Sequence, residues 1–175
     1  MSHKRRSGPP PCHFCECGDH AWAPATAGRV TLVDTDDAHL LAKCLWYTAG
    51  HGYGYARGTI DGRTDSLHRL VAGTAAHLWT DHKNRNTMDN RRRNLRQCSP
   101  TENHGNAVKQ SRNSSGFKGV RWDTRENKWY ACVRANKRVV SCGYFRDATS
   151  AAKAYNKKAG ELFGEFALLN DVVDQ

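Results

Sequence analysis

Hydrophobic and polar residues alternate most regularly in the last third of the chain. Three runs rich in β-branched and aromatic residues, 119–123, 128–134 and 139–145, are separated by two turn-like stretches, Thr-Arg-Glu-Asn and Ala-Asn-Lys. This spacing predicts three antiparallel strands.

A helix is predicted after the third strand. Asp147 suits the N-cap position, and the apolar residues that follow recur at intervals of three and four, as one face of a helix requires. These residues are Ala148, Ala151, Ala152, Tyr155, Ala159 and Leu162. We therefore expect a three-stranded antiparallel sheet packed on one helix.

Side chains on the middle predicted strand divide between two faces, because successive residues of a strand point to opposite sides. Those expected to face the helix are Trp129, Ala131 and Val133, and those expected to face outward are Tyr130, Cys132 and Arg134. Arg121, from the first strand, makes the outer face basic. A sheet face of this kind can lie in a DNA major groove.

Shorter hydrophobic runs occupy the chain between residues 28 and 71. β-branched and aromatic runs broken by Gly and Asp predict strands, and a short stretch near Ala38 predicts one helix. The predicted strands cover 29–33, 46–47, 54–57 and 66–71. We expect them to form a small β-rich scaffold with Trp46 in its core.

A hairpin followed by a helix is predicted in the middle of the chain. Asp81 and His82 end a short segment, a loop rich in Asn and Arg follows, and a second short segment covers 94–98. Ser99 and Glu102 then have the spacing of a capping box, in which each side chain satisfies a backbone amide of the first turn. A helix should therefore begin at Pro100. The fold class expected for the whole chain is α+β.

Polar stretches divide the chain into domains. Residues 1–11 are basic and then proline-rich, which is typical of a flexible arm. Residues 108–115 are polar and lack periodicity, which predicts a linker. One domain is therefore expected over 12–107 and another over 116–175.

The charge of the chain narrows the class of partner. Its 175 residues include 27 Lys and Arg against 17 Asp and Glu, a formal net charge of +10. This balance favours a polyanion, although a ribosomal or membrane-surface protein would show it too. No apolar run approaches the ~18 residues of a membrane span, so we expect a cytoplasmic protein without a membrane partner.

Cysteines cluster near the N-terminus. The total of seven is odd, which argues against a disulfide framework. Zinc takes four thiolate or imidazole ligands tetrahedrally, and Cys12, Cys15, Cys17 and His20 offer such a set within nine residues. The alternative is a tight turn with free thiols, since the usual second half-site is absent.

Residue types around the predicted hairpin suit phosphodiester hydrolysis. A carboxylate and an amide oxygen are hard ligands for Mg²⁺, which also binds phosphate oxygens. A neutral histidine can remove a proton from an attacking water. Asp81, His82 and an amide on the capped helix would supply both functions at one site.

The motifs Asp81-His82, Asp89-Asn90-Arg91, Asn94-Leu95-Arg96 and Glu102-Asn103-x-x-Asn106 resemble the His-Asn-His (ββα-metal) endonucleases, particularly the homing endonucleases. The resemblance implies that His82 is the general base, that Asp81 and Asn103 hold Mg²⁺ or Mn²⁺, and that Asn94 pins the loop. His68, followed by Arg69, matches a pair often seen upstream; it is either part of the site or simply packed.

Two positions depart from the family pattern. Arg85 stands where the family often has a glycine, and the third signature residue is Asn103 rather than a histidine. Asn106 and His104 are therefore rivals of Asn103 as the second metal ligand.

A strand carries neighbouring side chains on opposite faces, so Asp81 and His82 can serve one site only if the strand ends or twists there.

A second resemblance covers residues 116–170. Phe117-Lys118-Gly119-Val120-Arg121, Gly143-Tyr144-Phe145 and Phe163-Gly164-Glu165-Phe166 are similar to the APETALA-two / ethylene-response-factor DNA-binding domain. It implies base contacts from Arg121 and Arg134, with Lys118 and Trp122 as weaker candidates. Ser141 replaces a tryptophan of the plant members, so the plant target sequence does not transfer.

Together these observations predict a modular nuclease that cuts double-stranded DNA, with no small-molecule substrate. Additional DNA contacts are expected from Arg91, Arg93 and Arg96. The alternatives are a DNA-binding regulator whose nuclease half is not catalytic, and a structural nucleic-acid-binding protein without sequence preference.

Overall fold

The computed structural model describes residues 12–49, 54–109 and 113–172. They form two compact units that divide between Gln97 and Cys98, and each unit is considered by itself. Several small antiparallel sheets combine with short helices and one long helix, which confirms the α+β class. None of the helices in these ranges has the length and apolar character that a membrane crossing needs.

The N-terminal unit begins with a three-stranded antiparallel sheet, β1 (His13–Phe14), β2 (His20–Pro24) and β3 (Val30–Asp34). Only the third of these strands was predicted. Alternation places Ala21 and Ala23 of β2 and Val33 of β3 fully inside the unit. A 3-10 turn (Thr35–Asp37) and the short helix α1 (Ala38–Leu41) follow, as expected near Ala38.

A second antiparallel sheet contains β4 (Tyr47–Ala49), β5 (Tyr55–Ile60) and β6 (Arg63–Ser66). The strand predicted over 66–71 is wrong, because this segment is helix α2 (Leu67–Ala72). Its buried residues Leu67, His68 and Val71 follow helical spacing, and Gly73 ends the helix with a left-handed φ of 58°.

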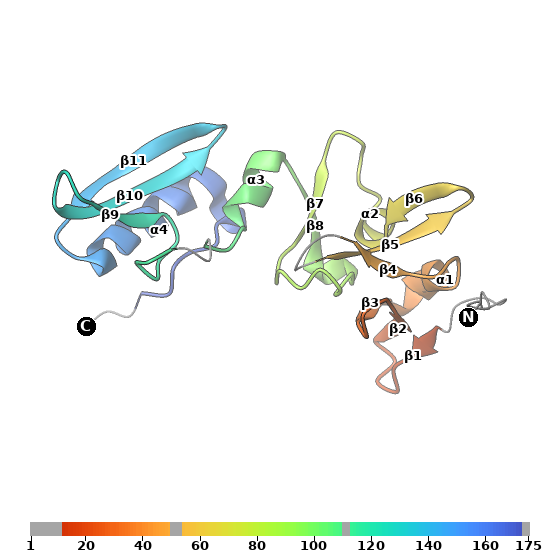
Figure 1. Cartoon of the computed structure of the whole chain (residues 1–175). Helices are drawn as coiled ribbons and strands as arrows, with labels where there is room; N and C mark the ends of the chain where they lie inside the picture. The colour runs from red at the N-terminus through yellow and green to blue at the C-terminus, as the bar shows by residue number, and fades with distance from the viewer. Residues whose placement is uncertain (1–11, 50–53, 110–112, 173–175) are drawn as a thin grey trace, which may run out of the picture. The chain divides into compact units, whose positions relative to one another are not determined.

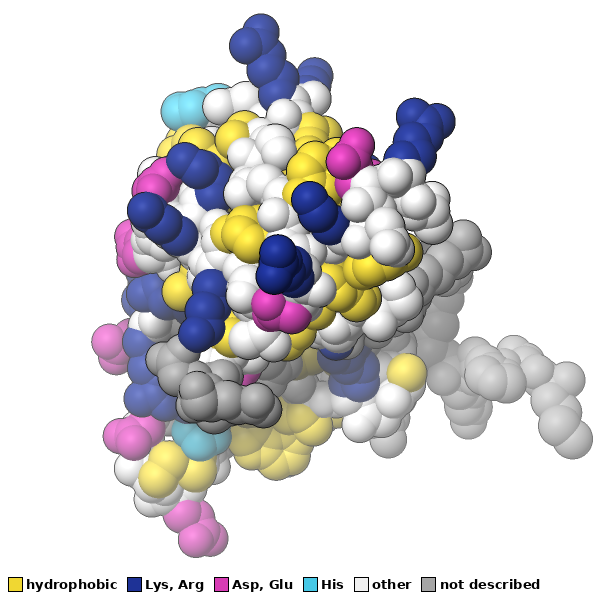
Figure 2. Space-filling view, turned by 90° about the vertical axis from the view of Figure 1, so that its left-hand side faces the viewer, with side chains coloured by type: hydrophobic (Ala, Val, Ile, Leu, Met, Phe, Trp, Pro, Cys, Tyr) yellow, Lys and Arg dark blue, Asp and Glu magenta, His cyan; other side chains and the backbone are white. Residues whose placement is uncertain are grey.

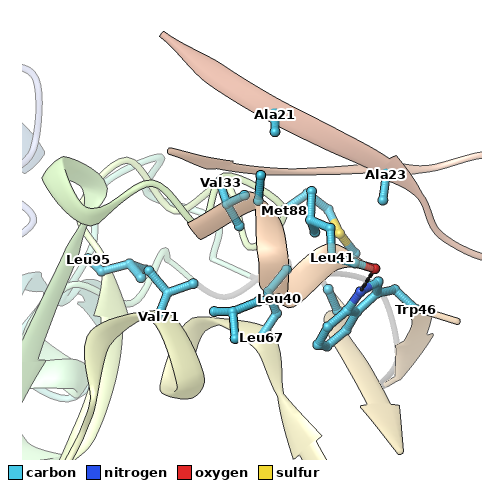
Figure 3. Close-up of a cluster of buried hydrophobic side chains, with 12 residues drawn as sticks. Ala21, Ala23, Val33, Leu40, Leu41, Trp46, Leu67, Val71, Met88 and Leu95 are labelled. Carbon is cyan, nitrogen blue, oxygen red and sulfur yellow. Dashed lines mark hydrogen bonds between the residues drawn. The ribbon is translucent and has the colours of Figure 1, made fainter. Parts of the chain in front are cut away.

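The hydrophobic core of the N-terminal unit joins these elements (Figure 3). Leu41 and Leu67 are fully buried, and Trp46 is only 3% exposed. Trp46 lies in the core as predicted, and its indole Nε1 donates to the carbonyl of Leu41 at 3.1 Å. This bond satisfies the polar atom that burial would otherwise leave without a partner.

The predicted hairpin is present as β7 (Trp79–His82) and β8 (Leu95–Cys98), with a 3-10 turn (Arg92–Asn94) before β8. Helix α3 (Pro100–Gly105) follows and belongs to the C-terminal unit. The capping box is confirmed, since Ser99 accepts from the amide of Glu102 and the Glu102 side chain accepts from the amide of Ser99 at 2.7 Å. Segment 108–115, expected as a linker, lies within this unit's bounds.

The C-terminal unit contains the predicted sheet and helix. Strands β9 (Val120–Asp123), β10 (Lys128–Ala135) and β11 (Arg138–Phe145) form the sheet, with β10 in the middle. Helix α4 (Ala148–Phe163) runs along one face of it (Figure 1), and a 3-10 turn (Gly164–Phe166) follows. Asp147 caps α4 by accepting from the amide of Ser150, as predicted.

The face of α4 that packs on the sheet differs from the prediction at its two ends, since Ala148 at the first turn is only half-buried and the last turn buries a different residue. Ala151, Ala152 and Ala159 are fully buried, but Leu162 is 42% exposed and Phe163 takes its place in the core at 5%. Small alanines let the helix approach the sheet closely.

Gly119 is required by its surroundings. It has a φ of +74°, and a Cβ added there would lie 2.2 Å from the Tyr155 ring and 2.7 Å from the carbonyl oxygen of Cys132. Gly116 has a similar φ of +80° but nothing within 4 Å. Substituting each glycine therefore measures the cost of backbone strain alone at Gly116 and the cost of strain together with crowding at Gly119.

We predict that Gly119→Ala lowers the free energy of unfolding by about 3 kcal/mol or more, since left-handed strain of ~1–2 kcal/mol is joined by overpacking. Gly116→Ala, the matched control, should cost only the strain. Urea unfolding of the full chain, followed by circular dichroism, measures both. Equal losses in the two variants would contradict the crowding seen at Gly119.

Candidate active site

The strand β7 ends where the candidate site begins. His82 is its last residue, and the chain then turns, with the amide of Arg85 donating to the carbonyl of His82 at 2.9 Å. The amide of Lys83 donates to the carbonyl of Asn94 at 2.8 Å and closes the hairpin. The strand therefore ends at the Asp81-His82 pair, as the predicted arrangement of the two side chains requires.

His82 is held by Asn90. The imidazole is 3% exposed, and its Nε2 lies 3.0 Å from Oδ1 of Asn90. The Asn90 Nδ2 donates to Thr31 Oγ1 at 2.8 Å and to the carbonyl of Met88 at 3.3 Å, which fixes Oδ1 as the atom that faces His82. His82 Nε2 must therefore carry the proton, and Nδ1 carries the lone pair.

Burial keeps this imidazole neutral. Loss of solvation lowers the pKa of His82, and the hydrogen bond that Nε2 donates to Asn90 and the nearby carboxylates of Asp81 and Asp89 oppose this only in part. A neutral imidazole with a fixed tautomer is the form that a general base needs.

Asn90 is a residue of this site to which no role is assigned from the sequence, although it stands in the motif Asp89-Asn90-Arg91. Asn90 is completely buried, and its backbone amide donates to the carbonyl of Leu32 at 2.8 Å. The motif Asp89-Asn90-Arg91 is the signal that the sequence offers for this residue. Its contacts with β3 could not be predicted, because they join segments nearly sixty residues apart.

Asn94 ties the two ends of the loop together. Its Nδ2 donates to the carbonyl of Asp89 at 2.7 Å, and its Oδ1 accepts from the amide of Asn84 at 3.0 Å. Asp89 in turn binds the guanidinium of Arg91, at 2.7 Å from Nε and 2.8 Å from Nη2. These are the contacts that a loop-pinning residue would make.

Arg96 pairs with Asp81 across the hairpin. Its Nε and Nη2 donate to Oδ2 of Asp81 at 2.9 and 2.8 Å, and both side chains are largely buried. The guanidinium compensates for the burial of the carboxylate. Arg91 and Arg96, from which DNA contacts were expected, are thus bound to carboxylates of the same unit, whereas Arg93 is exposed.

His68, on helix α2, lies against the ring of His82. Their ring centroids are 5.2 Å apart, and Tyr55 stacks obliquely on His68 at 4.9 Å. Burial, with the nearby His82 and Arg69, lowers the pKa of His68 to about 3. Within the described residues its buried Nδ1 has no hydrogen-bond partner, so the structure brings His68 to the site as a second neutral imidazole.

The outer face of the C-terminal sheet is basic and aromatic, as predicted. Arg121, Tyr130 and Tyr144 are register partners across the three strands, and the guanidinium of Arg121 lies 5.0 Å from the centroid of the Tyr130 ring. Arg134 is exposed farther along β10. Lys and Arg side chains are spread between hydrophobic ones over the view in Figure 2.

Two weaker candidates for DNA contact lie elsewhere. Trp122 pairs with Trp129, ring centroids 5.3 Å apart, and so shares the face of the sheet that packs on α4. Lys118 Nζ donates to the carbonyl of Gly105 at 2.6 Å. Neither side chain therefore lies on the face of Arg121, although Trp122 is 40% exposed.

Three of the four predicted zinc ligands lie together. Atoms of Cys15, Cys17 and His20 are all within 4.8 Å of one another, as a metal ion would need. The thiol of Cys12 instead lies 3.7 Å from the carbonyl oxygen of Ala38, against the core.

A relative among known proteins is similar to most of this chain. The uncharacterized HNH endonuclease L560 of Acanthamoeba polyphaga mimivirus is 31% identical to this chain over 153 residues, which cover 83% of the chain and 76% of the relative. The chain belongs to the HNH endonuclease family. Neither a family model nor a solved structure matches it.

Arg85 shows why HNH endonucleases often have a glycine at this loop position. Its φ is 64°, in the left-handed region that disfavours residues with a Cβ. The HNH loop of this chain tolerates the strain because the hydrogen bonds of Asn84, Asn90 and Asn94 hold it on both sides.

We predict that Arg85→Gly raises the free energy of unfolding by about 0.5–1 kcal/mol. Glycine removes the left-handed strain from the folded state, and the greater conformational entropy that it brings to the unfolded chain cancels only part of this gain. Arg93→Gly removes the same charge from an exposed position without left-handed φ, and should destabilise the protein. Thermal unfolding of both variants measures the difference. A loss of stability in Arg85→Gly would show that the Arg85 side chain outweighs its backbone strain.

Proposed function

We propose that this HNH endonuclease is a metal-dependent enzyme of the homing type, which hydrolyses phosphodiester bonds at specific sites in double-stranded DNA by nicking or by cutting both strands. The observation that carries the proposal is the buried contact between His82 Nε2 and Asn90 Oδ1 at 3.0 Å. It gives the end of β7 a neutral imidazole with its lone pair on Nδ1, the atom to which we assign proton acceptance.

His82 acts as the general base in this mechanism. Its Nδ1 accepts a proton from a water molecule, whose oxygen forms a bond with phosphorus while the bond from phosphorus to the 3′ oxygen breaks. The departing 3′ oxygen takes a proton from solvent. Asn90 fixes the neutral tautomer before this proton transfer, and the rings of His68 and Tyr55 lie beside the His82 ring.

The carboxylate of Asp81 would hold the divalent ion, Mg²⁺ or Mn²⁺, since it is a hard oxygen donor. The ion would supply charge stabilisation for the phosphate and the departing oxygen. Arg96 holds Oδ2 of Asp81 and so orients the carboxylate. Asn103 of α3 stays the predicted second ligand, with Asn106 and His104 as its rivals.

Site selection is assigned to the C-terminal sheet. Arg121 and Arg134 lie on its exposed face beside Tyr130 and Tyr144, a combination that suits base and phosphate contacts in duplex DNA. The resemblance to the APETALA-two / ethylene-response-factor domain supports this role, and residues 116–175 would form the domain. The nuclease domain would then cover 12–107.

We predict that His82→Ala lowers the rate of plasmid cleavage in Mg²⁺ by about 10²–10⁴-fold while DNA binding persists, because a general base is lost and phosphate contacts are kept. His77→Ala, at an exposed turn, is the matched control and should cut normally. Gel assays of cleavage and of mobility shift measure the two activities. Normal cutting by His82→Ala would remove the general-base assignment, and binding without cutting by the wild type would favour a DNA-binding regulator.

We predict that Arg121→Ala and Arg134→Ala each weaken binding of the full chain to its preferred duplex by about 1–3 kcal/mol. Arg125→Ala, in the exposed turn between β9 and β10, removes the same charge away from this face and should cost much less. Competition with unrelated duplexes separates base contacts from phosphate contacts. If Arg125→Ala weakens binding as much as the other two, the outer face of the sheet is not the recognition surface.

A further inference from the structure

The turn between β1 and β2 gathers three metal-binding side chains. The Sγ atoms of Cys15 and Cys17 are 2.7 Å apart, and Nδ1 of His20 lies 3.5 Å from the Sγ of Cys17. Among the His, Cys, Asp and Glu side chains of the described residues, these three are close enough together to share a metal ion. It lies in the first sheet, away from the hairpin of the HNH motif in sequence, and the proposed reaction does not use it.

The backbone prearranges this turn. The amide of Cys15 donates to the carbonyl of His20, and the amide of Gly18 donates to the carbonyl of Cys15, both at 2.9 Å. The amide of Cys17 donates to the Sγ of Cys15 at 3.4 Å, which holds the two cysteines close together in the turn. Gly18 has a φ of 76°, which lets the chain double back so tightly.

We propose that the β1–β2 turn binds one Zn²⁺ through Cys15 Sγ, Cys17 Sγ and His20 Nδ1, with water in the fourth position. Two thiolates and an imidazole form a set that zinc prefers over Mg²⁺ or Ca²⁺. Cys12 is not a ligand in this proposal, because its thiol lies against the carbonyl of Ala38 on the core. The site is exposed, so water reaches the fourth position.

A small movement of the sulfurs accompanies binding. With Zn–S bonds of about 2.3 Å in a tetrahedral site, two sulfurs lie ~3.8 Å apart, so Cys15 and Cys17 must separate by about 1 Å. Cys17 is exposed and Cys15 is partly so, which leaves their side chains room to rotate. A disulfide would need the sulfurs to approach to about 2.05 Å instead, and it is the competing outcome of the test.

Zinc at this position would stabilise the first sheet, which contacts the HNH loop. His20 is the register partner of Asp34, whose Oδ2 accepts from the amide of Arg92 at 2.6 Å. The hydroxyl of Thr35 also donates to the carbonyl of Gly18 at 2.7 Å. The turn, the end of β3 and the end of the loop are thus linked by direct contacts, so an ion in the turn stabilises all three.

The test is metal analysis of the full-length protein, purified under reducing conditions without chelators and freed of any affinity tag. We expect about one zinc per chain by mass spectrometry in the wild type and in Cys12→Ser, and a loss of most of it in Cys15→Ser, Cys17→Ser and His20→Ala. Co²⁺ exchanged into the site should give thiolate charge-transfer absorption that Cys12→Ser leaves unchanged. A loss of about a third of that absorption in Cys12→Ser would make Cys12 a third thiolate ligand and overturn the proposed set.

Thermal unfolding provides a second measurement that does not depend on the folding of the three ligand variants. Removing zinc with a chelator, in buffer without Mg²⁺, should lower the melting temperature of the wild type and of Cys12→Ser by several degrees, and Zn²⁺ should restore it. Absence of zinc in the wild type together with no response to added Zn²⁺ would overturn the proposal. So would a Cys15–Cys17 disulfide found by peptide mass spectrometry in the reduced preparation.

Discussion

The candidate active site depends on the burial of one amide side chain. Asn90 is fully enclosed and uses both ends of its carboxamide, with Oδ1 toward His82 and Nδ2 toward Thr31 and Met88. Since a buried polar group without partners costs about 1–3 kcal/mol, the loop, strand β3 and the imidazole are each constrained by the same residue. The orientation of His82 follows from this constraint rather than from its own strand.

Three buried carboxylates in the N-terminal unit neutralise arginines of the same unit. Asp37 binds Arg92, Asp89 binds Arg91 and Asp81 binds Arg96, and each of these carboxylates is almost buried. In a chain with a net charge of +10, such pairs fix the arginine-rich loop in one conformation while other basic groups stay exposed. Counting arginines in a motif therefore overestimates how many are available for DNA.

Local signals in the sequence were sufficient for elements whose shape is set by near neighbours. The capping box at Ser99 and Glu102, the cap at Asp147 and the alternation along β10 all depend on residues within a few positions, and the structure confirms them. Segment 66–71 is predicted as a strand although it is a helix, because over so short a length its apolar residues fit both the period of a strand and that of a helix. The sequence could not show that Trp122 packs against Trp129 or that Arg96 binds Asp81, since both contacts depend on pairing between strands.

The bridge between Leu32 and Asp89 has a consequence for how the protein folds. It is a parallel contact, and around it Thr31 and Asn90 are joined across 59 residues and Asp37 and Arg92 across 55. Contacts so distant in sequence form only after a large loop of chain has closed, which is slow compared with the formation of a helix or a hairpin. The ordered HNH loop is therefore expected late in folding, after β3 is in place, and a nascent chain that has not yet docked this loop would lack the fixed His82.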